Sequence, residues 1–166
     1  FKFGGAPRIT ILAAQQDILR FAKAHNKPVW FDVHIWNDEP RDTDQLDKGM
    51  GVRSFVDALK KIGDGAQFKV CVFEENANNH QLRRGLGHAH IINEIQRYEH
   101  EMPILCAANC LQPEGQNDNG WDQGLLFLNP SKVWGQSSYY VTQMVSRSYQ
   151  PLCVESYVDS YNDSLA

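Results

Sequence analysis

Alternation of strand-like and helical segments is the feature that most constrains the fold of this chain. The strand-like segments are short and apolar, and they lie at 29–36, 68–73 and 104–108. Apolar residues recur at helical spacing before and between them, at 9–24, 54–62 and 82–95. This order is typical of βα units around a parallel sheet. We therefore predict an α/β fold, with any ligand site at the C-terminal ends of the strands.

The remainder of the chain contains two polar loops and a second group of elements. Residues 37–50 and 109–124 are polar and contain Pro and Gly, which predicts loops. After the second loop come an apolar run at 125–128 and a segment around 139–148 that is compatible with a helix. The alternation of apolar and polar residues at 152–158 predicts a strand of a different character from the earlier ones.

Composition narrows the possible partners. The 166 residues carry 16 Lys and Arg against 20 Asp and Glu, so the formal charge is −4, and 42% of the residues are hydrophobic. The chain lacks the basic patch that a nucleic acid requires, and no apolar run approaches the roughly 18 residues that span a bilayer. We therefore expect a globular protein with no nucleic acid and no membrane partner.

Histidine and cysteine spacing does not favour a metal site. His88 and His90 fall on a predicted helix, where two residues of separation turn the side chains about 200° apart. The four cysteines contain no C-x-x-C pair and are expected to be buried structural thiols. We predict that the protein holds no metal ion.

The first strand-like segment has one apolar face and one mixed face. Its mixed face carries, by the period of two, Trp30, Asp32, His34 and Trp36. Because the apolar face of a parallel sheet packs on helices, we expect the mixed face to look into the functional interior. His34 and Trp36 would then lie at the end of the strand. The alternative is a core histidine with one backbone hydrogen bond, next to a packing aromatic.

Two glutamates, Glu74 and Glu75, follow the second strand-like segment directly. A carboxylate at the end of a buried strand is either a catalytic group or a charge that emerges into solvent at a loop. Neighbours on a strand point to opposite faces, so at most one of the two faces a substrate directly. The alternation does not indicate which one, since Glu74 shares a face with Val72 and Glu75 shares a face with Phe73.

The loop after the third strand-like segment surrounds an aromatic residue with polar groups. Its sequence, LQPEGQNDNGWDQG, places Asn, Asp and Gln side chains around Trp121. Sugar sites combine hydrogen-bonding groups, which pair with hydroxyls, with an aromatic ring that stacks on the sugar. The loop is therefore a candidate sugar site. The alternative is a solvated surface loop that Trp121 anchors to the core.

Three stretches of sequence, in their order and spacing, resemble one family of enzymes. They are FDVHIWN at 31–37, VFEEN at 72–76 and NGWDQGLLFLNPSKVWGQSSYYV at 119–141. Together they resemble the C-terminal half of the catalytic domain of α-L-arabinofuranosidases of glycoside hydrolase family 51, over residues 8–160. The resemblance implies that residues 1–150 form the C-terminal portion of a (β/α)₈ TIM barrel, about strands 6 to 8. Residues 151–166 would then begin a C-terminal β-sandwich.

The resemblance also implies roles for individual residues. The family's nucleophile is a glutamate in a Glu-x-Asn context at the end of strand seven, and this pattern falls on Glu74 with Asn76. Glu75 stands where relatives typically carry an aromatic residue. Substrate-binding roles are implied for a histidine and an aromatic of strand six and for a Trp-x-Gln after strand eight, which match His34, Trp36, Trp121 and Gln123.

The activity implied is that of a retaining, non-reducing-end α-L-arabinofuranosidase, a hydrolase of carbohydrate metabolism that releases L-arabinose from polysaccharides or oligosaccharides. Retaining hydrolysis needs two carboxyl groups about 5–5.5 Å apart. The family's acid/base, a glutamate preceded by Asn at the end of strand four, has no counterpart here and is expected upstream of Phe1. We therefore expect the chain to be a fragment that is inactive alone. The chemistry requires no metal and no organic cofactor, and relatives often form homo-oligomers.

Two other functions remain open. One is another retaining barrel glycosidase, acting on β-glucan or xylan. The other is a non-catalytic, complete small α/β domain that binds a sugar or a protein partner through the same loops. A complete small domain would unfold cooperatively, whereas part of a barrel would expose sheet edges and aggregate.

Overall fold

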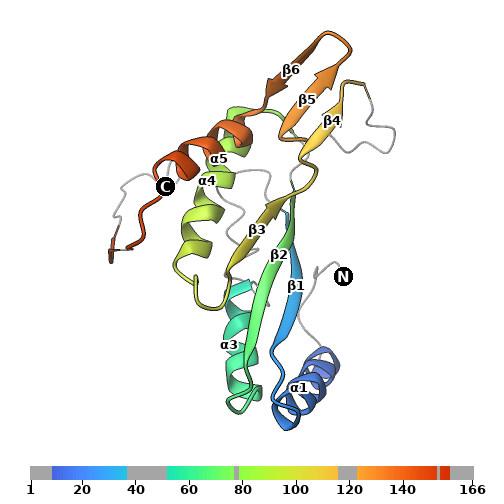
Figure 1. The fold of residues 1–166 in the computed structure, drawn as a ribbon, viewed down its shortest axis with the longest axis vertical. Helices are drawn as coiled ribbons and strands as arrows, with labels where there is room; N and C mark the ends of the chain where they lie inside the picture. Colours follow the sequence, from blue (N-terminus) through green and yellow to red (C-terminus); the bar gives the residue numbers. More distant parts are fainter. Residues whose placement is uncertain (1–8, 37–51, 77–78, 116–122, 153, 158–166) are drawn as a thin grey trace.

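The computed structural model describes residues 9–36, 52–76, 79–115, 123–152 and 154–157 (Figure 1). Within these residues the chain has a mixed α/β fold with two three-stranded sheets. The first sheet has the order β1-β2-β3 and is parallel throughout. Its strands are β1 (Val29–Trp36), β2 (Phe68–Asn76) and β3 (Ile104–Ala107). The predicted α/β class is confirmed, and the described strands form open sheets rather than a closed barrel.

Helices alternate with these strands as the sequence predicts. The helices are α1 (Ile9–Ala24), α3 (Val52–Ile62), α4 (Leu82–Gln96) and α5 (Ser137–Arg147). Helix α3 connects β1 to β2, and α4 connects β2 to β3. The helices and strands predicted between residues 9 and 108 are confirmed, although β2 continues past its predicted end at residue 73 to Asn76. Both Glu74 and Glu75 therefore belong to the strand itself.

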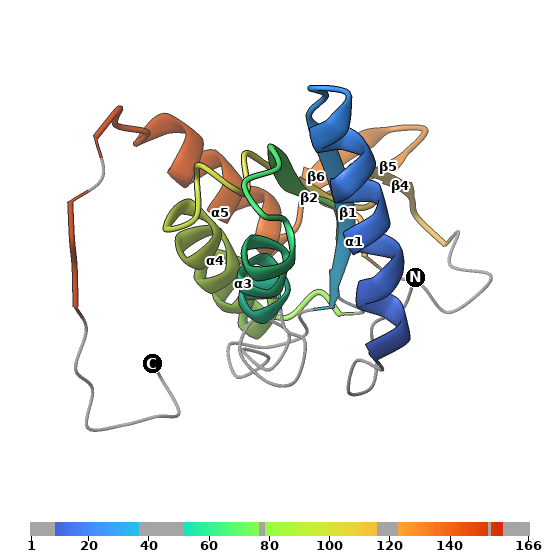
Figure 2. The same ribbon diagram turned by 90° about the horizontal axis from the view of Figure 1, so that it is seen from below.

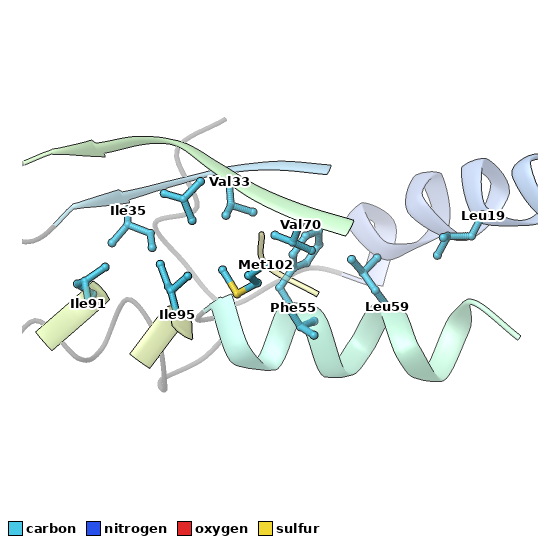
Figure 3. Packing of buried hydrophobic residues seen from close by; sticks show 11 residues of the cluster. Leu19, Val33, Ile35, Phe55, Leu59, Val70, Ile91, Ile95 and Met102 are labelled. Carbon is cyan, nitrogen blue, oxygen red and sulfur yellow. The ribbon is translucent and has the colours of Figure 1, made fainter. Parts of the chain in front are cut away.

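The hydrophobic core lies between one face of the first sheet and the helices. In Figure 3, Val33 and Ile35 extend from β1 toward Ile91 and Ile95 of α4. The cluster also contains, from α1, α3, β2 and the segment before β3, Leu19, Phe55, Val56, Leu59, Val70, Val72 and Met102. Figure 2 shows α3 and α4 next to each other beneath the sheet, and an ion pair between Arg53 and Glu94 joins them. The apolar face of β1 packs on helices, as predicted.

A second sheet follows β3 and corrects one sequence prediction. Its strands are β4 (Leu111–Pro113), β5 (Leu126–Asn129) and β6 (Lys132–Gly135). Strand β4 pairs with β5 in parallel, and β5 pairs with β6 in an antiparallel hairpin. The prediction of an uninterrupted loop at 109–124 is therefore wrong at β4. Strands of three or four residues are too short to show a period, so pairing rather than local pattern defines them.

The hairpin turn has a local cause. The Asn129 side-chain oxygen accepts hydrogen bonds from the backbone N–H groups of Ser131 and Lys132, at 3.0 Å each. This is the Asx-type bonding through which asparagine stabilises turns, and Pro130 supports it with a fixed φ. The apolar run at 125–128 is thus the first half of a hairpin.

The strand predicted at 152–158 is absent from the described part of this segment. Residues 152 and 154–157 lie in no strand, and Leu152, Val154 and Tyr157 are at least 78% exposed. Arg97, at the end of α4, donates to the Ser156 carbonyl oxygen at 3.4 Å. A strand needs a neighbour that accepts its hydrogen bonds, and none of the described strands pairs with this segment. An alternating pattern in the sequence does not show whether such a neighbouring strand exists.

Close approach of α4 and α5 depends on Gly85. A Cβ atom at this position would lie 2.9 Å from the Cβ of Ser137 and 3.3 Å from its backbone carbon. We expect Gly85→Ala to lower the free energy of unfolding by about 1–3 kcal/mol, because the start of α5 must move away. Urea denaturation measures this. Helix propensity alone predicts the opposite sign, about 1 kcal/mol of stabilisation, so a more stable variant would contradict the close approach.

Candidate active site

An extra residue in β2 sets the geometry of the strand end. Along β1 and β2, Val33 lies beside Val72, but the next pair is His34 beside Glu74. Phe73 is therefore an additional residue with no counterpart in β1. The register against β3 shows the same offset, since Val72 pairs with Leu105 and Glu75 with Ala107. Bulges of this kind re-aim side chains and are frequent near active sites.

The bulge determines which glutamate lies on which face. A shift of one residue moves every following side chain to the opposite face of a sheet. Glu74 consequently lies beside His34 on the open face, and Glu75 lies beside Ile35 on the face that packs on helices. Alternation counted along the sequence could not choose between Glu74 and Glu75. The register of the three strands shows only that Glu74, and not Glu75, lies on the open face.

Glu74, His34 and Asp32 form a connected group on the open face. Nδ1 of His34 lies 2.8 Å from Oε2 of Glu74, and its Nε2 lies 2.8 Å from Oδ2 of Asp32. An imidazole whose two nitrogens both carry protons donates to both carboxylates at once. The side chains of His34 and Glu74 are 39% and 35% exposed, so an incoming molecule can reach them. The alternative of an ordinary core histidine is therefore wrong for His34.

Asp32 has a second contact that the sequence does not predict. Its Oδ1 accepts a hydrogen bond from the backbone N–H of Phe73, the extra residue, at 3.2 Å. The signal for including Asp32 was present, because it lies two residues before His34 on the same face of a strand. Nothing in the sequence indicates the bulge that brings the Phe73 amide to it.

Glu75 faces away from this group and is fully buried. Its Oε2 lies 2.8 Å from Nδ1 of His88 on α4, an ion-pair distance whose alignment departs from that of a hydrogen bond. Nε2 of His88 lies 2.9 Å from the Thr142 hydroxyl, and that hydroxyl bonds the Ser138 carbonyl on α5. Glu75 thus joins β2 to α4 and α5.

Of the other predicted site residues, the structure describes Trp36 and Gln123. Trp36 is half-buried at the end of β1. Gln123 is buried, and its backbone is held on both sides: its N–H donates to Gln112 Oε1 at 3.1 Å, and its carbonyl accepts from Arg84 at 2.5 Å. Its own Oε1 is buried without a hydrogen-bond partner among the described residues. Trp121 and the side chain of Asn76 lie outside what the structure describes.

The His34 ring separates the two carboxylates of this group. The imidazole ring of His34 occupies the space between Asp32 and Glu74, since each of its nitrogens contacts one of them. A ligand therefore cannot lie directly between these two carboxylates.

Cys71, on β2, is a buried free thiol. Burial raises the pKa of Cys71, and the nearby Asp32 carboxylate and Cys106 thiol add to the increase. A thiol with a raised pKa stays protonated at neutral pH and is a poor nucleophile. The expectation that the cysteines are all buried is wrong, because Cys106 and Cys110 are exposed. Cys153 lies outside the described residues.

The described part of the chain also holds a cavity on the opposite side from Glu74. It has a volume of about 460 Å³ and lies between α4, α5 and β3, with Ile92, Leu105 and Val145 in its wall. In the same residues, no cluster of three or more His, Cys, Asp or Glu side chains is arranged to hold a metal ion. None of the described helices is long and apolar enough to cross a membrane.

Comparisons with protein families, with curated proteins and with solved structures find no match to this chain.

Proposed function

We propose that this chain is the nucleophile-bearing part of a retaining glycoside hydrolase that releases terminal α-L-arabinofuranosyl residues, with Glu74 as the nucleophile. The observation that carries the proposal is the position of Glu74. It lies near the C-terminal end of a parallel strand, on the open face of the sheet, 2.8 Å from His34. Parallel α/β folds bind substrates at that end of their strands.

The arrangement of the sheet supports a barrel rather than a doubly wound fold. The apolar faces of β1 and β2 pack on α1, α3 and α4 in one core, whereas a doubly wound sheet carries helices on both faces. The opposite face bears Asp32, His34 and Glu74, together with Trp30, which is 51% exposed. Parallel sheets are normally covered on both faces. We infer that the open face is the interior wall of a (β/α)₈ barrel.

The proposed chemistry assigns one step to Glu74. Its carboxylate attacks the anomeric carbon, the bond from that carbon to the glycosidic oxygen breaks, and the departing oxygen takes a proton from a second carboxyl group. Water then cleaves the glycosyl ester with the help of that second group. The second carboxyl group comes from outside the described residues, and His34 orients Glu74 for the attack.

Gln123 is the best-supported substrate contact after His34. A buried amide oxygen without a donor costs about 1–3 kcal/mol, and Gln123 Oε1 is in this situation. A sugar hydroxyl would supply the donor. Trp36 and Trp121 are proposed to provide the aromatic walls of the pocket.

The test is hydrolysis of a panel of aryl glycosides by the complete enzyme that contains this chain. We expect release of the aryl group from α-L-arabinofuranosides, with NMR showing that the first arabinose product keeps the α configuration. We expect no release by the 166-residue chain alone. Preference for aryl β-glucosides or β-xylosides would favour the other retaining glycosidase. Sugar binding without any hydrolysis would favour a non-catalytic domain.

A further inference from the structure

We propose that Asp32 is a positioning residue that holds the bulge in β2 and thereby decides that Glu74, rather than Glu75, faces the substrate. The inference rests on the proposed role of Glu74. The two oxygens of Asp32 have separate partners: Oδ1 accepts from the Phe73 N–H at 3.2 Å, and Oδ2 contacts His34 Nε2 at 2.8 Å.

The contact with Phe73 stabilises the bulge. An extra residue in a strand is left unpaired in the ladder, and a backbone N–H that finds no acceptor is costly. Asp32 provides an acceptor from its own side chain. Without the bulge, the alternation of β2 would continue unbroken from Val72, which would turn Glu74 toward the helices and Glu75 toward the open face.

The contact with His34 fixes the ring that touches Glu74. With Nε2 held by Asp32, Nδ1 is directed at Glu74 Oε2. Since the His34 ring lies between Asp32 and Glu74, Asp32 acts on the reaction through its neighbours and does not touch the sugar. Outer-shell groups of this kind orient the groups that react.

Amide exchange of Phe73, measured in the complete protein that contains this chain, tests the structural half of the proposal. Asp32→Asn keeps an acceptor oxygen, so the Phe73 amide should exchange as slowly as in the wild type. Asp32→Leu removes it, and we expect exchange at least ~10-fold faster, the effect of losing about 1.4 kcal/mol of protection. Asp57→Asn, an exposed position on α3, is the matched control. Unchanged exchange in Asp32→Leu would overturn the proposal.

Kinetics of the complete enzyme test the functional half. Asp32→Asn keeps the bulge but loses the charge that orients His34, so we expect kcat to fall by about 100-fold, the effect of a small misplacement of a reacting group. KM should stay nearly unchanged, because Asp32 does not bind substrate. Asp32→Leu should lower kcat by more than Asp32→Asn does. Wild-type kcat in Asp32→Asn, or a loss confined to KM, would contradict a positioning role.

The two proposals fail in different ways. A wild-type enzyme without arabinofuranosidase activity would refute the proposed function, and the Phe73 exchange would still decide whether Asp32 holds the bulge. An active wild-type enzyme whose Asp32 variants are also fully active would refute only the role of Asp32.

Discussion

Replacing Glu74 with alanine in the complete enzyme is expected to lower kcat on an aryl α-L-arabinofuranoside by about 10⁴-fold or more, the scale seen when a nucleophile is removed. Without the carboxylate, no covalent glycosyl intermediate forms. The fold should survive, since the Glu74 side chain is 35% exposed and its ion-pair partner is also partly exposed. Steady-state release of the aryl group measures the effect.

Azide distinguishes a missing nucleophile from a damaged site. The space left by the Glu74 side chain lies next to His34, and a small anion can enter it. We expect azide to restore part of the activity and to give a β-arabinofuranosyl azide, because attack comes from the face opposite the leaving group. Glu99→Ala, at an exposed position after α4, should behave as the wild type. Azide rescue of Glu75→Ala instead would show that the assignment is wrong by one residue.

Replacing Glu75 with alanine is expected to destabilise the protein rather than to remove a reacting group. Glu75 is fully buried and lies 2.8 Å from His88, which is itself buried. Removing one member of a buried ion pair leaves the other without compensation, at a cost of about 3–5 kcal/mol. Urea denaturation of the complete enzyme, compared with its wild type, should show this loss in the free energy of unfolding.

A double variant separates loss of the pair from loss of packing. Glu75→Leu combined with His88→Leu removes both polar partners and fills the space with apolar side chains, a change that is often neutral or stabilising. Thr142 keeps its hydrogen bond to the Ser138 carbonyl in this variant. We expect the double variant to recover most of the stability that Glu75→Ala loses. If Glu74→Ala proved more destabilising than Glu75→Ala, the assignment of the two side chains to opposite faces would be contradicted.

The elements that the sequence predicts best are those with long periodic patterns. Strand β1 and helices α1, α3 and α4 each bury one face, and their apolar spacing records that burial. Strands β4 and β6 were missed because they contain three and four residues. Their definition depends on pairing with β5, which lies on the far side of a polar segment. Residues 152–158 are the opposite case. They have an alternating pattern, but none of the described strands pairs with them.

For the candidate site as well, the sequence pattern predicts some features and the strand register determines the others. The alternation of β1 by itself determined that Asp32, His34 and Trp36 share the face away from the helices, because side chains on a strand alternate strictly. Alternation could not show which of Glu74 and Glu75 lies on that face, because one extra residue in β2 reverses the alternation. Only the tertiary structure places Glu74 on the open face: the register of β2 against β1 and β3 leaves Phe73 unpaired, and the Asp32 carboxylate accepts its N–H. Hydrogen bonds between strands distant in sequence set this register, so the local pattern of residues 68–76 does not contain it.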